Sequence, residues 1–380
     1  MPFSSFELSS ALLKAISKQN YTARYPVQKE AIPAILKGKD ILGIAPTGSG
    51  KTASYVLPIL ELFQKQKPSH NRHVNTLVLA PTRELAIQIN EAFNTFGEYL
   101  PVKIKSMAVY GGVSINPQMI GLQGVEVLVA TPGRLLELVS AKAVSISMIQ
   151  ILVVDEADKM LNLGFKEEMT RIFAQIPAMR QTLLYSATLS DDLNAFNQVL
   201  LRQPLVIKVE EEKNNIDLIE QTAYLISEVK KGPLLRYIIK NNSNQQALVF
   251  ASSIYRADII VDKLKANGID ARAIHSKKSQ EARRIALDLF KSGKIKVLVA
   301  TDLIARGIDI QNLPYVINYE LPRSPKDYIH RIGRTGRAET PGEAISLITP
   351  EDEHHFKIIQ KKTGKIATLI DGNAIDLQGY

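Results

Sequence analysis

The sequence contains no cysteine, which excludes disulfides, thiolate metal sites and cysteine nucleophiles and is neutral about the cellular compartment. No apolar stretch approaches the roughly 18 residues that a membrane-spanning helix needs. Residues 1–7 do not combine a basic region with an apolar one, so no signal peptide is visible. Low-complexity segments and repeats of a fixed short period are also missing. We therefore expect a soluble, cytoplasmic protein with no membrane partner.

What is present is a long, basic chain. Its 380 residues exceed one ordinary domain, and a hydrophobic content of 45% is enough for a sizeable core. The net charge of +9 is uneven, because residues 1–217 hold 22 basic and 20 acidic side chains (+2) and residues 218–380 hold 25 and 18 (+7). Such an excess favours a polyanionic partner. A basic protein with no nucleic-acid role fits the charge alone equally well.

Short apolar runs alternate with helical patterns along the whole chain. The runs are rich in Val, Ile and Leu and mostly lack strict alternation, which is typical of strands buried on both faces of a parallel sheet. In the first half they are residues 40–45, 76–81, 125–131, 149–155, 181–186 and 204–209, with helical patterns at 9–18, 51–64, 83–96 and 165–175. In the second half they are residues 221–226, 247–251, 271–275, 296–301, 315–319 and 343–348, with helical patterns at 255–266, 280–290 and 324–331.

This restart predicts two α/β domains, each a mainly parallel sheet flanked by helices. The polar stretch 210–217 has no apolar periodicity and is the predicted linker between domains 1–209 and 218–380. A solvated loop inside one large domain is the alternative.

A glycine-rich segment at residues 45–52 follows a predicted strand and precedes a predicted helix. Gly48 and Gly50 let the backbone approach phosphate groups, Lys51 can reach the β and γ phosphates, and the Thr52 hydroxyl can bind Mg²⁺. Ala45 stands where the general phosphate-loop pattern has glycine, so the match is to a variant. The residues expected to bind the nucleotide here are Pro46, Thr47, Gly48, Ser49, Gly50, Lys51 and Thr52.

An acidic group, residues 155–158, follows the aliphatic run of residues 151–154. The carboxyl end of a strand is where a parallel sheet binds its ligands. Asp155 is placed to hold Mg²⁺, partly through water, and Glu156 to orient and deprotonate the attacking water. A solvated helix start is the bland alternative for such residues. The upstream phosphate loop favours the catalytic interpretation.

The second half carries three arginines within residues 330–337. Guanidinium groups can stabilise the charge that builds on γ-phosphate oxygens, so Arg334 and Arg337 are candidate arginine fingers. A basic surface loop is the alternative, but it does not explain why Gly333 and Gly336 separate the arginines. His330 and Arg331 are expected to contact the phosphate and the acidic group.

Taken together, the phosphate-loop variant, residues 155–158, residues 186–188 and the arginine-rich segment resemble the DEAD-box RNA helicases of superfamily 2. The resemblance runs from about Phe3 to about Lys362 and implies two tandem RecA-like domains, ATP, Mg²⁺ and RNA-stimulated hydrolysis. The chain is most similar to the bacterial RhlE-like subgroup, although the basic extension often found there is missing.

The resemblance assigns further nucleotide-binding positions. Gln28 is similar to the glutamine that reads adenine, Tyr21 to the aromatic that stacks on the base, and Phe3 to the aromatic that supports it. Asn20 and Arg24 stand where the family usually has glycine and proline, which puts adenine selectivity in doubt.

Other positions are assigned to the ribose and to coupling between ATP and RNA. Asp309 would meet the ribose, whereas Thr301 and Arg306 would couple RNA to the cleft. Ser186 and Thr188 would link hydrolysis to strand separation through hydrogen bonds to Asp158.

Several segments resemble the family's RNA contacts. They end predicted strands with proline, glycine or hydroxyl residues, which suits backbone phosphate binding with no sequence preference. Few aromatics are present, so base stacking is not expected, and 2′-hydroxyl contacts would select RNA. The expected RNA-binding residues are Pro81, Thr82, Arg83, Gly111, Gly112, Thr131, Pro132, Gly133, Arg134, Ser252, Gln280, Arg283, Thr301 and Arg306.

The sequence thus predicts an ATP-dependent RNA helicase that opens short duplexes when two domains close around ATP and RNA. A DNA translocase, an ATP-gated RNA clamp and a nucleotide switch with a protein target stay open as alternatives. We expect a monomer, with ribosome-assembly or RNA-decay proteins as candidate partners. The pair His354 and His355 lacks a third ligand and is assigned to a helix surface.

Overall fold

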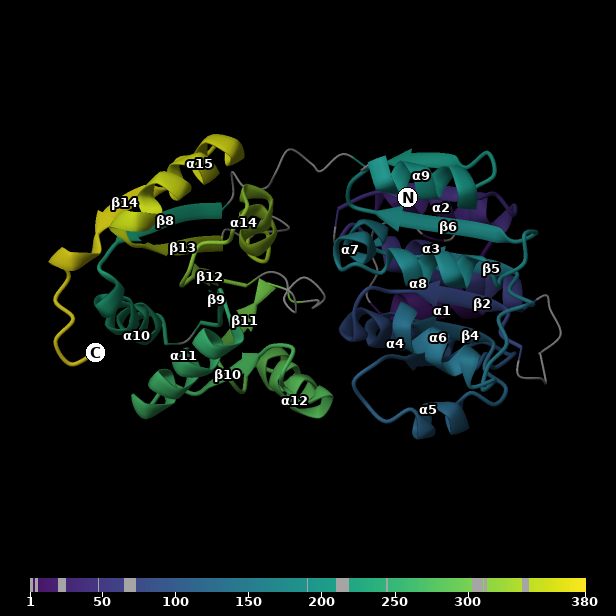
Figure 1. The fold of residues 1–380 in the computed structure, drawn as a ribbon, viewed down its shortest axis with the longest axis horizontal. Coiled ribbons are helices and arrows are strands. Elements are labelled where there is room, and N and C mark those ends of the chain that lie inside the picture. The colour runs from purple at the N-terminus through teal and green to yellow at the C-terminus, as the bar shows by residue number, and fades with distance from the viewer. Residues whose placement is uncertain are drawn as a thin grey trace. The chain divides into compact units, whose positions relative to one another are not determined.

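A computed structural model of the chain describes residues 3, 6–19, 25–46, 48–64, 73–189, 191–209, 219–243, 245–302, 310, 313–336 and 342–380. These residues fall into two compact units, Met1–Glu211 and Glu212–Tyr380 (Figure 1). The predicted linker at 210–217 lies outside the described residues, and the predicted domain boundaries stay predictions. None of the described helices is long and apolar enough to cross a bilayer.

The first unit is built on a parallel sheet in the order β3-β4-β2-β5-β6-β1-β7. Its strands are β1 (Ile41–Ile44), β2 (Thr76–Leu79), β3 (Ser106–Val109), β4 (Val127–Ala130), β5 (Ile151–Val154), β6 (Gln181–Ser186) and β7 (Leu205–Lys208). The interior strands β2, β4 and β5 are buried at every position. This burial on both faces explains why their sequences read as continuous apolar runs.

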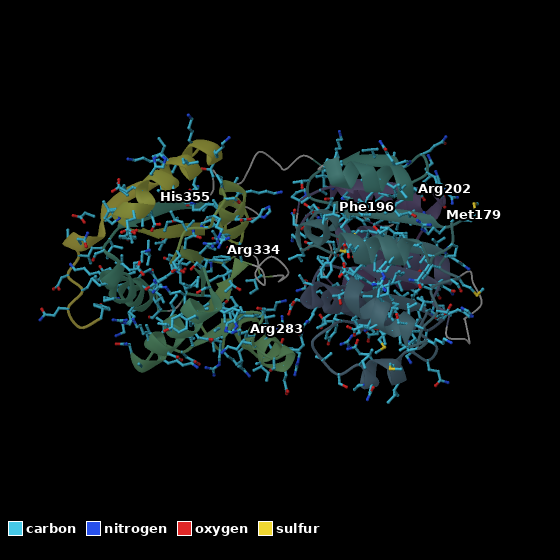
Figure 2. All side chains as sticks on the ribbon, in the orientation of Figure 1. Met179, Phe196, Arg202, Arg283, Arg334 and His355 are labelled. Atoms are coloured by element: carbon cyan, nitrogen blue, oxygen red, sulfur yellow. The ribbon has the colours of Figure 1, made fainter. Side chains whose placement is uncertain are left out.

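Helices cover both faces of this sheet. One face packs against α1 (Ser10–Lys18), α2 (Pro26–Leu36), α3 (Lys51–Phe63) and α4 (Arg83–Gly97). The other packs against α5 (Asn116–Gly121), α6 (Pro132–Ser140), α7 (Ala157–Asn162), α8 (Lys166–Phe173) and α9 (Asp191–Leu200). On that second face Phe173 and Phe196 meet edge to face, 5.9 Å between ring centroids; Phe196 is labelled in Figure 2.

The second unit repeats this plan with the strand order β10-β11-β9-β12-β13-β8-β14, again parallel. Its strands are β8 (Ile219–Leu225), β9 (Ala247–Ala251), β10 (Ala271–Ile274), β11 (Val297–Thr301), β12 (Tyr315–Asn318), β13 (Gly342–Ile348) and β14 (Thr368–Asp371). Its helices are α10 (Lys231–Asn241), α11 (Ile254–Ala266), α12 (Gln280–Lys291), α14 (Pro325–Ile332) and α15 (Glu353–Thr363). α10 and α11 pack on one face, whereas α12, α14 and α15 pack on the other.

Hydroxyl side chains start several of these helices directly after a strand. Thr82, Ser253, Ser279 and Ser324 each accept a hydrogen bond from a backbone N–H in the first turn of the helix that follows. Such caps satisfy amide groups that have no partner inside the helix. They also fix where the helix begins after each strand, at the carboxyl edge of the sheet.

The fold class predicted from the sequence is confirmed, with two seven-stranded parallel sheets flanked by helices. Two strands were not predicted. β3 is half-buried over most of its length and β14 is largely exposed, and both lie at sheet edges. Because few of their side chains are buried, the sequences of these two strands lack the continuous apolar run of a strand covered on both faces.

Candidate active site

The phosphate loop connects β1 to α3 and brings its glycines into a conformation that other residues adopt rarely. Gly48 and Gly50 both have φ = +81°. A Cβ on Gly50 would lie 2.4 Å from Gln28 Nε2 and 2.6 Å from Tyr25 Cδ2, so only glycine fits there. Lys51 begins α3, is 7% exposed and donates from Nζ to Ala45 O at 2.9 Å. The Lys51 side chain therefore reaches back to the start of the loop. Thr47 lies outside the described residues.

Gln28 lies against this loop. Its Nε2 donates to Gly50 O at 3.1 Å and its Oε1 accepts from Tyr25 N at 3.1 Å, with the side chain fully buried. The amide thus fastens α2 to the phosphate loop. Since a carboxamide has two N–H donors and two acceptor lone pairs, these two bonds do not use up its capacity to read an adenine edge, as the resemblance implies. Phe3 is 4% exposed and packs edge to face on Phe6 at 6.0 Å. Tyr21, Asn20 and Arg24 lie outside the described residues.

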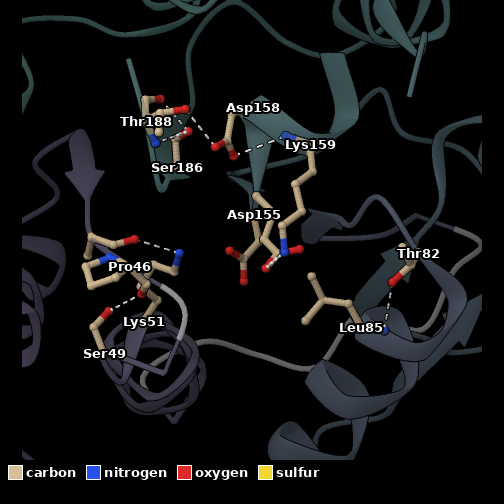
Figure 3. A network of polar contacts seen from close by, with 12 residues as sticks. Pro46, Ser49, Lys51, Thr82, Leu85, Asp155, Asp158, Lys159, Ser186 and Thr188 are labelled. Atoms are coloured by element: carbon tan, nitrogen blue, oxygen red, sulfur yellow. Dashed lines mark hydrogen bonds and ion pairs between the residues drawn. The ribbon is translucent and has the colours of Figure 1, made fainter. Parts of the chain in front are cut away.

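Asp155 directly follows β5 and is 2% exposed. Its Oδ2 accepts a hydrogen bond from Tyr55 at 2.8 Å, whereas its Oδ1 is buried with no hydrogen-bond partner among the described residues. A buried carboxylate oxygen without a partner is costly unless it meets a ligand. In Figure 3 Asp155 and Lys51 face the same edge of the sheet.

Glu156 follows in a left-handed conformation, φ = 52° and ψ = 48°, directly before α7. Its Oε1 pairs with Lys159 Nζ at 2.7 Å, and its Oε2 is buried with no hydrogen-bond partner in the described part of the chain. Burial and the neighbouring Asp155 charge raise the pKa of Glu156, while Lys159 and Lys51 oppose that shift. A raised pKa makes the carboxylate a better proton acceptor, as a general base requires.

Asp158 connects the acidic group to the end of β6. Its Oδ2 accepts from Thr188 Oγ1 at 2.9 Å, so the expected hydrogen bond to Asp158 is made by Thr188 (Figure 3). Ser186 Oγ instead donates to Thr188 O at 2.8 Å. Ala45 N also donates to Ser186 O, which ties this turn to the phosphate loop.

These residues fit the divalent cation that the sequence predicts. Asp155 offers one unpartnered oxygen, and Thr52 stands in the first turn of α3. Among the described residues no cluster of three acidic or histidine side chains could hold a metal ion unaided. A magnesium ion here would therefore take most of its ligands from phosphate oxygens and water, as is usual for Mg²⁺.

Tyr55 is a site residue that the sequence analysis missed. It is fully buried four residues after Lys51 on α3, and its hydroxyl donates to Asp155. Burial, together with the Asp155 charge, raises the pKa of Tyr55 well above its usual value, so the hydroxyl stays protonated. Its position four residues after Lys51 on one helix could have identified it. In an otherwise apolar helix, however, the sequence does not show which polar group a tyrosine hydroxyl contacts.

Replacing Tyr55 with phenylalanine should leave Asp155 buried with both oxygens unpartnered. Since hydrogen bonds to charged groups contribute about 1.5–3 kcal/mol, we expect the free energy of unfolding in urea to fall by that amount. Tyr185→Phe is the matched control, because among the described residues the hydrogen-bond partner of its hydroxyl is the neutral Ser54 Oγ, at 2.9 Å. A Tyr55→Phe variant no less stable than Tyr185→Phe would contradict the assigned bond.

Three predicted RNA-binding segments lie at the carboxyl ends of neighbouring strands in the first unit. Thr82 follows β2, Gly112 follows β3 and Thr131 follows β4, so the structure brings them to one edge of the sheet. Gly112 has φ = +77°, and a Cβ there would lie 2.0 Å from Arg83 Nη2. Arg134 is 6% exposed, donates from Nη2 to Val113 O and pairs with Glu137, both at 2.8 Å. The two arginines thus shape this edge in addition to carrying charge.

In the second unit Arg331 differs from its expected role. Its guanidinium makes a bidentate pair with Asp302 at 2.6 and 2.8 Å and also donates to Asn318 Oδ1 at 3.0 Å. It stacks over the Phe250 ring at 4.8 Å and is 2% exposed. Its charge therefore holds the end of β11 against α14, rather than being open to a phosphate.

Arg334 follows α14 and is 7% exposed (Figure 2). Its backbone carbonyl accepts from Leu313 N at 3.1 Å, which fixes the turn. Gly336 has φ = +64°, and a Cβ there would lie 2.4 Å from Ile219 Cγ1. His330 lies in the last turn of α14, whereas Arg337, Arg306 and Asp309 lie outside the described residues.

The remaining predicted RNA contacts also lie beyond the carboxyl ends of strands. Ser252 follows β9 and donates from its backbone N to Glu320 at 2.6 Å, and Thr301 ends β11. Gln280 begins α12 and accepts from Arg283 Nη2 at 2.6 Å. Arg283 is 2% exposed (Figure 2), so as placed it positions Gln280 and does not present its charge to solvent.

Comparisons with known proteins agree with this geometry. Residues 25–196 match the family model described as DEAD/DEAH box helicase, and residues 230–339 match the helicase conserved C-terminal domain. The DEAD-box ATP-dependent RNA helicase CshA of Bacillus cereus is 37% identical over 98% of this chain and 70% of its own length. CshA of Streptococcus pneumoniae is 39% identical over 96% of this chain and 69% of its own length. Because these relatives carry the name CshA, the RhlE-like subgroup stays a prediction.

Solved structures give the same result. Dbp5 of S. cerevisiae bound to RNA and ADP BeF3 covers 97% of this chain and 95% of its own, with 29% identity and a TM-score of 0.84. A DEAD box protein from Methanococcus jannaschii covers 98% and 99%, with 32% identity and a TM-score of 0.55. The chain therefore belongs to the DEAD/DEAH box helicase family.

Proposed function

We propose that this protein is an ATP-dependent RNA helicase that couples ATP hydrolysis to the local opening of short RNA duplexes. The observation that carries the proposal is the joint placement of Lys51, Asp155, Glu156 and the Asp158–Thr188 pair at one sheet edge. Family membership and the CshA relatives, named as ATP-dependent RNA helicases, support the same activity. The similarity to Dbp5 bound to RNA and ADP BeF3 supports the choice of nucleic acid and nucleotide.

In this proposal each residue of the phosphate loop and acidic group has one task. Lys51 leaves Ala45 O to hold the β and γ phosphates, and Gly48 and Gly50 let backbone amides approach them. Glu156 orients a water molecule and accepts its proton as the water oxygen attacks the γ-phosphorus and the bond to the β-phosphate oxygen breaks. Mg²⁺, held by Thr52 and Asp155 partly through water, would neutralise charge on the phosphate oxygens.

The second unit supplies the cations that finish the reaction. We propose that ATP and RNA draw the two units together and that Arg334 and Arg337 then reach the γ-phosphate. The same closure would bend one RNA strand and so open the duplex locally. Thr188 and Asp158 would link the two events, because one hydrogen bond joins the acidic group to the end of β6.

RNA would bind through its backbone along the carboxyl edges of both sheets. The segments at Thr82, Gly112 and Thr131 lie on one such edge, and those at Ser252, Gln280 and Thr301 on the other. Backbone contacts give no sequence preference, so targeting would come from partner proteins. We propose a monomer that acts in the cytoplasm, with ribosome-assembly or RNA-decay proteins as candidate partners.

The test measures ATP hydrolysis without nucleic acid, with single-stranded RNA and with DNA of matched sequence, together with unwinding of a short RNA duplex. We expect RNA, and not DNA, to stimulate hydrolysis and ATP to drive unwinding. Stimulation by DNA instead would favour a translocase, and binding without unwinding would favour a clamp. Hydrolysis that ignores RNA would favour a nucleotide switch with a protein target.

A further inference from the structure

A basic cavity lies at the opposite edge of the first sheet from the phosphate loop. It is open, has a volume of about 720 Å³, and is lined by the segments that lead into β1, β6 and β7. These three strands are neighbours in the sheet and parallel, so their amino ends meet there. The phosphate loop, Asp155 and Ser186 lie at the carboxyl ends of the same sheet. Strands of four to six residues separate the two edges by about 13–20 Å, at roughly 3.3 Å per residue.

Three cations line this cavity. Lys39 and Arg202 are exposed, and Arg180 is half-buried. Among the described residues none of the three forms a salt bridge, and Arg202 Nη1 contacts only the sulfur of Met179, at 3.0 Å. Figure 2 labels Arg202 and Met179 next to each other on this unit.

The one acidic side chain in the cavity is already engaged. Asp40 is 7% exposed, and its two oxygens accept from Thr182 N and Arg202 N, each at 2.8 Å. It therefore fixes the backbone of β6 and of the segment before β7 instead of pairing with a guanidinium. With three cations and one carboxylate, the lining carries a formal charge of +2.

Arg180 has unused hydrogen-bonding capacity. Its Nη1 donates to Pro177 O at 2.6 Å, but its Nε is buried with no hydrogen-bond partner in the described part of the chain. Burial, and then the positive charge of Arg202, lower the pKa of Arg180, and Asp40 only partly opposes this. An anion bound beside both guanidinium groups would offset their mutual repulsion.

Capping of helix carbonyls does not account for these cations. The last carbonyls of α2 face this edge, but Ala34 O accepts from Lys39 N, and Ile35 O accepts from Gly38 N and Gln181 Nε2. Those bonds come from backbone and amide groups. Lys39, Arg180 and Arg202 line the cavity, and the bonds to these carbonyls do not involve their side chains.

We propose that this cavity is a second anion site, distinct from the ATP site, which binds a phosphate monoester or pyrophosphate group through Arg180, Arg202 and Lys39. A phosphate monoester carries about two negative charges near pH 7, which matches the formal charge of the lining, and guanidinium groups can donate two parallel N–H groups to phosphate oxygens. The same chemistry could come from a free phosphorylated small molecule or from the 5′-phosphate of an RNA strand. The two sources are separated by experiment.

The first experiment titrates pyrophosphate into the full chain by calorimetry in the presence of excess ADP and Mg²⁺, which occupies the phosphate loop. We expect saturable binding that ADP does not compete away. In Arg180→Gln/Arg202→Gln it should weaken by about tenfold or more, because charge-assisted hydrogen bonds are lost. The matched control Lys142→Gln/Arg171→Gln removes two exposed charges outside the cavity and should bind as the parent does.

The second experiment compares 5′-phosphorylated and 5′-hydroxyl RNA strands of one sequence. A tighter affinity for the phosphorylated strand that disappears in Arg180→Gln/Arg202→Gln assigns the site to RNA ends. Equal affinities together with pyrophosphate binding assign it to a free anion. The exposed Arg202→Gln alone should give a partial loss if the double variant misfolds.

The ATP hydrolysis rate of these variants without added anion should match the parent rate, because none of the substitutions touches the phosphate loop or acidic group. Absence of saturable pyrophosphate binding and of any 5′-phosphate preference would overturn the second site. So would equal binding by the parent and the Arg180→Gln/Arg202→Gln variant. Neither outcome bears on the ATP site, which is tested separately.

Discussion

Replacing Lys51 with alanine is expected to reduce ATP hydrolysis by at least about 10²–10³-fold, the typical effect of removing one pre-positioned donor from a charge that develops during reaction. Lys51 is 7% exposed and lies 2.9 Å from Ala45 O, inside the loop that would surround the phosphates. No other lysine or arginine belongs to the described residues of that loop. The measurement is steady-state phosphate release with saturating RNA.

Lys142→Ala is a suitable control for this prediction, because Lys142 is an exposed lysine of the same unit outside the site. It should hydrolyse ATP at the parent rate. Parent-like turnover in Lys51→Ala would remove the phosphate loop from the reaction, whatever the fate of the other residues.

Replacing Glu156 with glutamine is expected to lower hydrolysis by about 10²–10⁴-fold, the range that a positioned general base contributes. The substitution keeps the size of the side chain and removes its ability to accept a proton. Since Glu156 does not bind the phosphates in this account, ATP should bind about as tightly as before. Fluorescent nucleotide titration and single-turnover hydrolysis, measured on one preparation, separate the two effects.

Two controls distinguish lost base chemistry from lost packing. Glu156 Oε1 pairs with Lys159 at 2.7 Å, so Lys159→Gln removes the ion pair but keeps the carboxylate and should affect turnover much less. Glu167→Gln changes an exposed glutamate on α8 and should have no effect. If Lys159→Gln were as slow as Glu156→Gln, the carboxylate would be a structural partner and not the base.

The sequence predicted the parts of the fold where burial or backbone conformation restricts which residue types can occur. Interior strands such as β2 and β5 are buried on both faces and so appear as unbroken aliphatic runs. Gly50 was also predictable, since a positive φ and a close neighbour leave room for no other residue. The strands β3 and β14 escaped prediction because most of their side chains are not fully buried, and such positions need not be apolar.

What each charged side chain contacts was less predictable from the sequence. Arg331, Arg134 and Arg283 all appear as cations next to phosphate-binding motifs, yet each is at most 6% exposed. Arg331 and Arg134 are paired with carboxylates from their own unit. Composition records a charge but not the partner that folding brings to it. Tyr55 shows the converse, because a position in an apparently apolar helix donates the hydrogen bond that Asp155 Oδ2 accepts, at 2.8 Å.

The central claim is that one reaction centre is divided between the two units, with Lys51 and Glu156 on the first and Arg334 on the second. The most direct measurement is a crystal structure of the full chain with RNA and ADP–beryllium fluoride. We predict that the Arg334 guanidinium lies within hydrogen-bond distance, about 2.7–3.2 Å, of a fluoride that stands for a γ-phosphate oxygen. Bound nucleotide and RNA with Arg334 still turned into its own unit, out of reach of that fluoride, would contradict the account.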